Sequence, residues 1–103
     1  MEKADLSTAR IEILADMCKV MGDPTRLQIL LGCLDKPQSV GEIALNLGIS
    51  DALASHHLRN LKAARLVRGE RRGQRVFYTA ADAHVRNFVL DMCAHVKEVR
   101  HDV

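Results

Sequence analysis

Four side chains near the end of the sequence have the chemistry of metal ligands: Asp82, His84, His95 and Glu98. Imidazole nitrogens and carboxylate oxygens both bind zinc, and two of each complete a four-coordinate shell without a thiolate. Such a set favours zinc or cobalt and argues against a soft metal or a catalytic site with an open position. The alternative is a surface helix whose histidines and acids merely face water.

The spacing of these residues decides how they can share an ion. We expect one helix over about residues 82–99, in which His84 and His95 lie within about 20° around the axis but about 16 Å apart along it. One ion cannot contact both, so the ligands form two local pairs within a chain. Antiparallel pairing of two such helices across a two-fold axis would join Asp82 and His84 of one chain with His95 and Glu98 of the other.

Two helices are predicted before this segment, at 5–21 and about 24–35. Apolar residues recur at helical spacing in both. The second has Asp23 as its N-cap and Pro24 at its first position, which suits the unpaired amides of a helix start. Gly22 ends the first helix.

Two further helices are predicted close together. Ser39 and Glu42 have the spacing of a capping box, and Gly48 ends that short helix. Ser50 begins the next helix, so the turn "LGIS" joins the two in a helix-turn-helix pattern. An αα-hairpin in a helical bundle would look similar.

The segment "RLVRGERRGQRVFYTA", residues 65–80, argues against a bundle. Apolar runs flank a charged, glycine-containing turn, as in a β-hairpin. A helix-turn-helix followed by a basic hairpin is a winged helix. We therefore expect a mainly α fold with a small β-hairpin, in the order α-α-α-α-β-β-α. Residues 1–103 would form a single domain that binds DNA and dimerises through its first and last helices.

The basic residues are clustered where this fold would contact DNA. The net charge is only +2, but seven of the fifteen Lys and Arg residues lie between Arg59 and Arg75. The start of the recognition helix faces base edges, whereas residues further along it and on the wing contact phosphates. The candidate DNA-binding residues are Ser50, Ser55, His56, Arg59, Lys62, Arg71, Arg72 and Arg75.

Three neighbouring features have simpler explanations. Asp51 would be repelled by phosphates; it could accept a hydrogen bond from a cytosine amino group, but we expect it to cap the helix. His57 lies on the inner stripe and is expected to be a hydrogen-bonded packing residue rather than a DNA contact. The charged wing tip, 70–75, could also be a solvated turn, but three arginines beside a helix-turn-helix favour DNA.

Composition is consistent with a folded protein, at 48% hydrophobic and 27% charged residues. The sequence shows no signal peptide and no run of about 20 apolar residues, so we expect a cytoplasmic protein without a membrane partner. Cys18, Cys33 and Cys93 form no disulfide framework. No oriented nucleophile or phosphate-binding glycine loop is present, so an enzyme is not expected.

The segments "GDPTRLQILL", "SVGEIA", "SDALASHHLRNLKAARLV", "RRGQRVFYTA", "DAH" and "HVKE" together resemble the ArsR/SmtB family of metal-sensing repressors over nearly the whole chain. The resemblance to its zinc sensors implies that Asp82, His84, His95 and Glu98 are the sensing ligands. It also implies a homodimer that binds operator DNA when metal-free and is released by zinc or cobalt. The family's arsenic, lead and cadmium sensors carry Cys-x-Cys in the segment that is "SVGEIA" here. Arg65 stands where the family usually has glycine.

Two rival hypotheses remain at this stage. Some members of the family sense metalloids, persulfides or oxidants through thiols, and Cys18 with Cys93 would serve here. Cys93 points about 200° away from His95, so it would not join the metal ligands. Both cysteines could instead be ordinary apolar packing residues. A winged helix used only for protein docking is the second rival, but it leaves the basic wing without a purpose.

Overall fold

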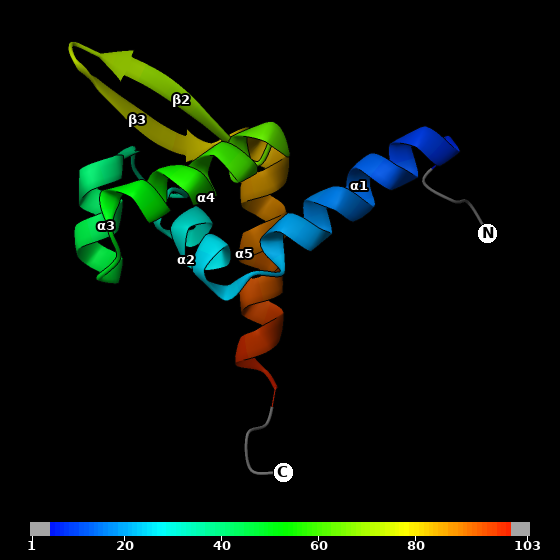
Figure 1. Cartoon of the computed structure of the whole chain (residues 1–103). Helices are drawn as coiled ribbons and strands as arrows, with labels where there is room; N and C mark the ends of the chain where they lie inside the picture. Colours follow the sequence, from blue (N-terminus) through cyan, green and yellow to red (C-terminus); the bar gives the residue numbers. More distant parts are fainter. Residues whose placement is uncertain (1–4, 100–103) are drawn as a thin grey trace.

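The computed structural model describes residues 5–99, which form five helices and three short strands. In chain order these are α1 (Thr8–Met21), α2 (Pro24–Gly32), β1 (Gln38–Ser39), α3 (Val40–Leu47), α4 (Asp51–Ala63), β2 (Val67–Arg72), β3 (Arg75–Ala80) and α5 (Ala83–Lys97). The expected order of helices and hairpin is confirmed, and the fold is a winged helix-turn-helix (Figure 1).

The helix starts follow the predicted capping chemistry. Asp23 Oδ2 accepts a hydrogen bond from the Arg26 amide at 3.0 Å, with Pro24 in the first turn of α2. The capping box of α3 is complete, because the Ser39 and Glu42 side chains each accept from the other's backbone amide. Gly48 ends α3 in the left-handed conformation, with φ of 67°. Such a φ favours glycine because a Cβ would crowd the backbone.

Some predicted boundaries differ from the structure. α1 begins at Thr8 rather than at residue 5, because the Ser7 hydroxyl accepts the Arg10 amide and fixes the helix start there. α2 ends at Gly32 rather than near residue 35. The amide of Cys33 then bonds to Ile29 and Leu30, which tightens the end of the helix.

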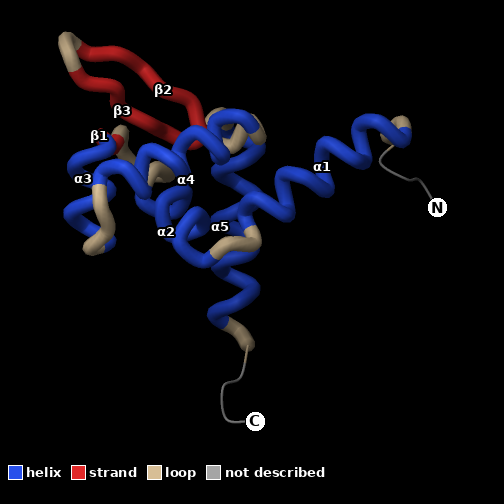
Figure 2. Tube along the Cα trace, in the orientation of Figure 1, coloured by secondary structure: helices blue, strands red, loops and turns tan. Residues whose placement is uncertain are grey.

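The wing is part of a three-stranded antiparallel sheet with strand order β1-β3-β2 (Figure 2). β2 and β3 pair from Val67 with Ala80 to Arg72 with Arg75, so a two-residue turn of Gly73 and Gln74 joins them. Gly73 has φ of 64°, as the first central residue of a type II′ turn requires. The strand β1 was not predicted, because two residues are too few to show an alternating pattern.

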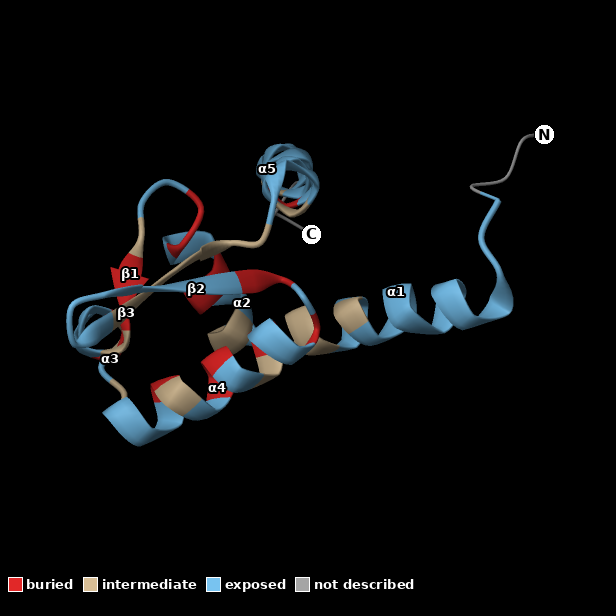
Figure 3. Ribbon diagram, turned by 90° about the horizontal axis from the view of Figure 1, so that it is seen from above, coloured by how far each residue is buried: buried red, intermediate tan, exposed pale blue. Residues whose placement is uncertain are grey.

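The core lies between α2, α3, α4 and the base of the wing, as Figure 3 shows. Its largest fully buried side chains are Ile29, Leu30, Cys33, Leu58, Leu61 and Leu66. The core is aliphatic, which agrees with a sequence that contains only three aromatic residues. The helix-turn-helix is thereby held rigidly against α2.

α1 and α5 are less well covered than the other helices. None of the residues of α1 is buried, and Val89 is the single buried residue of α5. Figure 1 shows α1 extending away from the core and α5 running down beside it. Large apolar side chains on both remain about half exposed, including Ile11, Ile13, Phe88 and Val96. Among residues 5–99, no helix is long and apolar enough to span a membrane.

Candidate DNA-binding and metal-binding sites

The start of α4 is capped by Ser50. Its Oγ accepts a hydrogen bond from the Leu53 amide at 3.0 Å. The expectation that Asp51 caps this helix is therefore wrong: Asp51 lies one residue later, in the first turn, where its carboxylate faces the positive end of the helix dipole. Ser50 keeps its place at the tip of the recognition helix, but its hydroxyl already has a partner inside the protein.

The outer face of α4 carries the predicted contact residues. His56, Arg59 and Lys62 are exposed, and Ser55 is half-buried at the edge of that face. The opposite face is buried in the core through Ala54, Leu58 and Leu61. This burial fixes the rotation of α4, so the same four polar residues always face outward. The arrangement presents one short polar and three cationic or titratable groups to a partner.

His57 is buried, with 9% of its surface exposed, as expected for a packing residue. However, its Nδ1 makes no hydrogen bond within the described residues, so the expectation of a fully hydrogen-bonded histidine is wrong. Burial lowers the pKa of His57, and the nearby carboxylate of Asp23 opposes this effect. The neutral imidazole is therefore the form that the fold favours.

The wing arginines do not form one uniform patch. Arg72 Nε is 2.8 Å from Glu70 Oε1, and both Arg72 and Arg75 stack over the ring of Phe77, with their Cζ atoms 5.3 and 5.7 Å from its centre. Arg75 Nη2 also lies 3.5 Å from Ser39 Oγ. Phe77 thus positions both arginines and Ser39 positions Arg75, and neither role was identified from the sequence, because the contacts depend on the strand register.

Arg71 lies on the other face of the hairpin. It pairs with Val76 in the register, whereas Glu70 pairs with Phe77, and neighbouring residues of a strand point to opposite faces. Among the described residues no hydrogen bond or ion pair holds its side chain. Within residues 5–99, Arg71 is therefore the wing arginine without a partner, and its side chain can contact an external anion.

The end of α4 contains an unusual backbone conformation. Arg65 has φ of 61° in the left-handed region, and its amide bonds to the Lys62 carbonyl at 2.9 Å. The Leu66 amide bonds to the Leu61 carbonyl at 2.9 Å, which completes a Schellman motif. Glycine is the residue that this backbone conformation favours. The turn into the wing therefore keeps its hydrogen bonds although Arg65 carries an unfavourable side chain.

The four candidate metal ligands all lie at the ends of α5 and are exposed. Asp82 is the N-cap, and its Oδ1 accepts the Val85 amide at 3.0 Å. His84 follows in the first turn. His95 lies in the last turn, and Glu98 is the C-cap residue, its amide bonded to the His95 carbonyl at 3.0 Å.

Within residues 5–99 of one chain, no three His, Cys, Asp or Glu side chains come close enough to hold a metal ion. Asp82 and His84 lie at the start of α5 and His95 and Glu98 at its end, so the structure does not unite the two pairs. The donor set fits zinc or cobalt, since every donor is nitrogen or oxygen and exposed to a ligand arriving from outside. The described residues of one chain therefore do not supply a four-coordinate protein shell at either end of α5.

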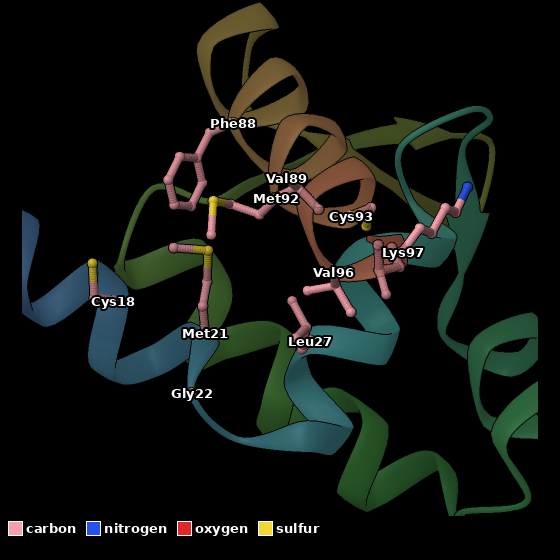
Figure 4. Close-up of a pocket in the computed structure, with 11 residues that line it drawn as sticks. Cys18, Met21, Gly22, Leu27, Phe88, Val89, Met92, Cys93, Val96 and Lys97 are labelled. Atoms are coloured by element: carbon pink, nitrogen blue, oxygen red, sulfur yellow. The ribbon is translucent and has the colours of Figure 1, made fainter. Parts of the chain in front are cut away.

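Two of the three cysteines line a common cavity. A largely apolar cavity of about 540 Å³ lies between α1, α2 and α5, lined by Cys18, Met21, Leu27, Met92 and Cys93 among others (Figure 4). Cys18 is exposed and Cys93 half-buried, whereas Cys33 is in the core. Burial raises the pKa of Cys33 to about 12. Cys33 is therefore not expected to take part in thiol chemistry at neutral pH.

Residues 23–68, from the N-cap of α2 to the start of β2, match the family described as bacterial regulatory protein, arsR family. The transcriptional repressor SmtB homolog of Synechocystis is 30% identical over 93 residues, which are 90% of this chain and 70% of that protein. The HTH-type transcriptional repressor SmtB of Mycobacterium tuberculosis is 35% identical over 88 residues, or 85% of this chain. The chain spans 65% of the length of that relative.

The fold is also similar to a solved structure. The homodimeric winged helix-turn-helix DNA-binding domain of Mb0332 from Mycobacterium bovis superposes with a TM-score of 0.85 at 27% identity. The comparison covers 100% of this chain and 96% of that domain. Its description as a homodimer is of interest here because α1 and α5 leave apolar side chains uncovered in the single chain.

Proposed function

Because this chain belongs to the arsR family of bacterial regulatory proteins, we propose that it is a homodimeric repressor that binds operator DNA when metal-free and is released by zinc or cobalt. Membership of a family of regulators agrees with the expectation that the chain is not an enzyme. The repressor role is inferred from the SmtB relatives, which are named as transcriptional repressors. Because its partner is DNA, we place the protein in the cytoplasm.

One observation carries the metal part of the proposal. The two ligand pairs lie at opposite ends of α5, exposed, and with no third donor nearby in the described chain. A second copy of α5, antiparallel to the first, would supply the missing donors at both ends. Asp82 and His84 of one copy and His95 and Glu98 of the other would hold the ion. The bound ion would link the two chains. DNA binding would act against that link.

The DNA part rests on the outer face of α4 and on the wing. His56, Arg59 and Lys62 project from a helix whose rotation is fixed by its buried face, and Arg71 is free on the hairpin. Recognition helices of such dimers enter major grooves about 34 Å apart. We expect selection from a random duplex pool, using metal-free protein, to enrich a partly palindromic sequence. Failure to enrich any sequence would favour a docking module instead.

Complementation between two defective variants tests the shared site. His84→Ala and His95→Ala homodimers should each lose tight zinc binding, because every site lacks one imidazole. A mixed dimer regains one complete site and keeps one without either imidazole. After random mixing, half of the dimers are mixed, so about a quarter of the wild-type zinc capacity should return. A site built within one chain would show no recovery at all, which would contradict the proposal.

A second candidate function is a thiol-based sensor of metalloids, persulfides or oxidants, favoured by the common cavity of Cys18 and Cys93 (Figure 4). Titration of the DNA complex with each effector distinguishes the two functions. DNA release by zinc that survives in a Cys18→Ser, Cys93→Ser variant supports the metal sensor. DNA release by arsenite or a persulfide donor, lost in that variant, supports the thiol sensor. Fluorescence anisotropy of the selected duplex measures both.

A further inference from the structure

The side chain of Arg86, on α5, contacts the segment that follows α2. Its Nε donates to the Leu34 carbonyl at 3.3 Å, and its Nη2 lies 3.4 Å from Asp35 Oδ1. Within the described residues, the side-chain hydrogen bonds that join α5 to another part of the chain are those of Arg86. The contacts join positions more than fifty residues apart in sequence.

The acceptor lies at the end of α2. Cys33 is the C-cap of α2, and its carbonyl accepts the Ala80 amide at 3.2 Å, just before α5 begins. The Leu34 carbonyl, the next one along, accepts from Arg86. Two successive carbonyls at the negative end of the α2 dipole are therefore bonded to residues on either side of the start of α5. A guanidinium is well suited to this position.

The end of α2 is directly connected to the recognition helix. α2 packs against α4, and Leu30 and Cys33 of α2 are fully buried in the same core cluster as Leu58 and Leu61 of α4. Packed interiors move as units rather than deform gradually. A displacement of the α2 end should therefore alter the placement of α4.

Arg86 and the candidate metal ligand His84 lie on different sides of the same turn. Two residues correspond to about 200° around a helix, so the side chains point in nearly opposite directions. His84 and Asp82 line a cavity beside Leu14 and Met17 of α1, whereas Arg86 contacts the end of α2. The first turn of α5 thus lies between the ligand pair and α2.

We propose that Arg86 transmits metal binding at the start of α5 to the recognition helix, by fixing the first turn of α5 to the Leu34 carbonyl. It is a positioning residue and contacts neither metal nor DNA. This inference rests on the proposed function, because it requires zinc to bind at Asp82 and His84. Without the Arg86 contact, movement of that turn no longer displaces α2 and α4.

The contact is not expected to contribute much to stability. Asp35 is largely exposed and the guanidinium is about half exposed, and ion pairs of this kind have little effect on unfolding. Arg86→Gln should therefore fold and dimerise like the wild type. The effect should appear in the coupling between zinc and DNA, which is the ratio of DNA affinities without and with zinc.

The test measures that ratio for the full chain by anisotropy of the selected duplex, with zinc affinity measured separately by chelator competition. In the wild type, zinc should weaken DNA binding by a factor in the range of about 5–150. In Arg86→Gln we expect this factor to fall at least fivefold, while zinc affinity and metal-free DNA affinity each stay within twofold. Arg86→Lys should not restore coupling, because the Leu34 and Asp35 contacts use two different nitrogens of the guanidinium, whereas lysine has a single nitrogen.

Two controls and one independent readout complete the test. Asp35→Asn and Asp91→Asn, the latter an exposed charge on the same helix, should keep the wild-type ratio. Amide exchange of Ala80 and Ala81 should be faster in metal-free Arg86→Gln. A wild-type ratio retained in Arg86→Gln overturns the inference alone. A wild type whose DNA binding is unaffected by zinc overturns both the inference and the metal-sensing proposal.

Discussion

Arg75 on the wing and Ser39 at the start of α3 lie within hydrogen-bonding distance, with 3.5 Å between Arg75 Nη2 and Ser39 Oγ. The contact follows from the pairing of β1 with β3, which places Ser39 opposite Phe77. It joins the wing to the first helix of the helix-turn-helix. Wing arginines that look equivalent in the sequence therefore have different roles, and the roles can be separated by experiment.

Arg71→Ala should weaken DNA binding without weakening the fold. Its side chain has no observed partner in the described chain, so its loss removes a phosphate contact and little else. The slope of log affinity against log salt should fall by about 1 for each protomer. Arg75→Ala is the contrasting variant: it should lower both the affinity and the melting temperature, because it also loses Ser39 and Phe77. Equal melting losses in both variants would contradict this division.

Arg65→Gly should stabilise the protein. Arg65 holds a left-handed backbone, with φ of 61°, which glycine adopts without a Cβ clash. We expect the free energy of unfolding to rise by about 1 kcal/mol, measured by urea denaturation. Arg65→Ala removes the same side chain but keeps the unfavourable conformation, so it should give no such gain. A gain shared by both variants would show that the side chain, not the backbone, is responsible.

Stability should fall as the pH decreases through the range in which the buried His57 titrates. Burial lowers the pKa of His57 below its ordinary value of 6.5, so the unfolded chain binds a proton that the folded chain resists. The contribution of His57 is therefore flat above about pH 6.5 and becomes destabilising below it. Urea denaturation at pH 7.5 and 5.5 should show a smaller loss for His57→Leu than for the wild type. The exposed neighbour provides the control, since His56→Gln should lose as much as the wild type.

The thiols should react in the order of their exposure. Iodoacetamide at pH 8 should modify Cys18 first and Cys93 more slowly, because Cys18 is exposed and Cys93 half-buried. Cys33 should be labelled only after unfolding in urea, since its burial raises its pKa to about 12. Mass spectrometry of peptides gives the order directly. Labelling of Cys33 in the native protein would mean that the core opens readily.

Helix starts and the wing could be predicted from the sequence because their signals are local. Asp23 with Pro24, and Ser39 with Glu42, act within four residues, and the structure contains both. The hairpin followed from apolar residues around a glycine turn. Ser50 was placed at the start of α4, and it caps that helix; Asp51 was also expected to cap it but lies in the first turn, because both residue types can cap and only the backbone conformation distinguishes them.

Contacts between distant segments could not be predicted in the same way. The Arg86 contact with Leu34, the stacking on Phe77 and the short strand β1 all depend on how far-apart elements meet. The family's usual glycine at position 65 is consistent with a left-handed backbone, but the conformation of Arg65 could be seen only in the structure. The shared metal site remains a prediction, because it depends on a second chain.

Because the apolar face of α1 is uncovered in a single chain, the folding of α1 in the proposed dimer should depend on the concentration of the protein. A helix of this length is marginal in water unless its apolar face is covered, and in the proposed dimer that cover is another copy of the chain. Dilution should therefore unravel α1 before the core melts, and a cell with too few copies would lose repression whatever its zinc level. The number of molecules, as much as the metal, would then set when the regulated gene is expressed.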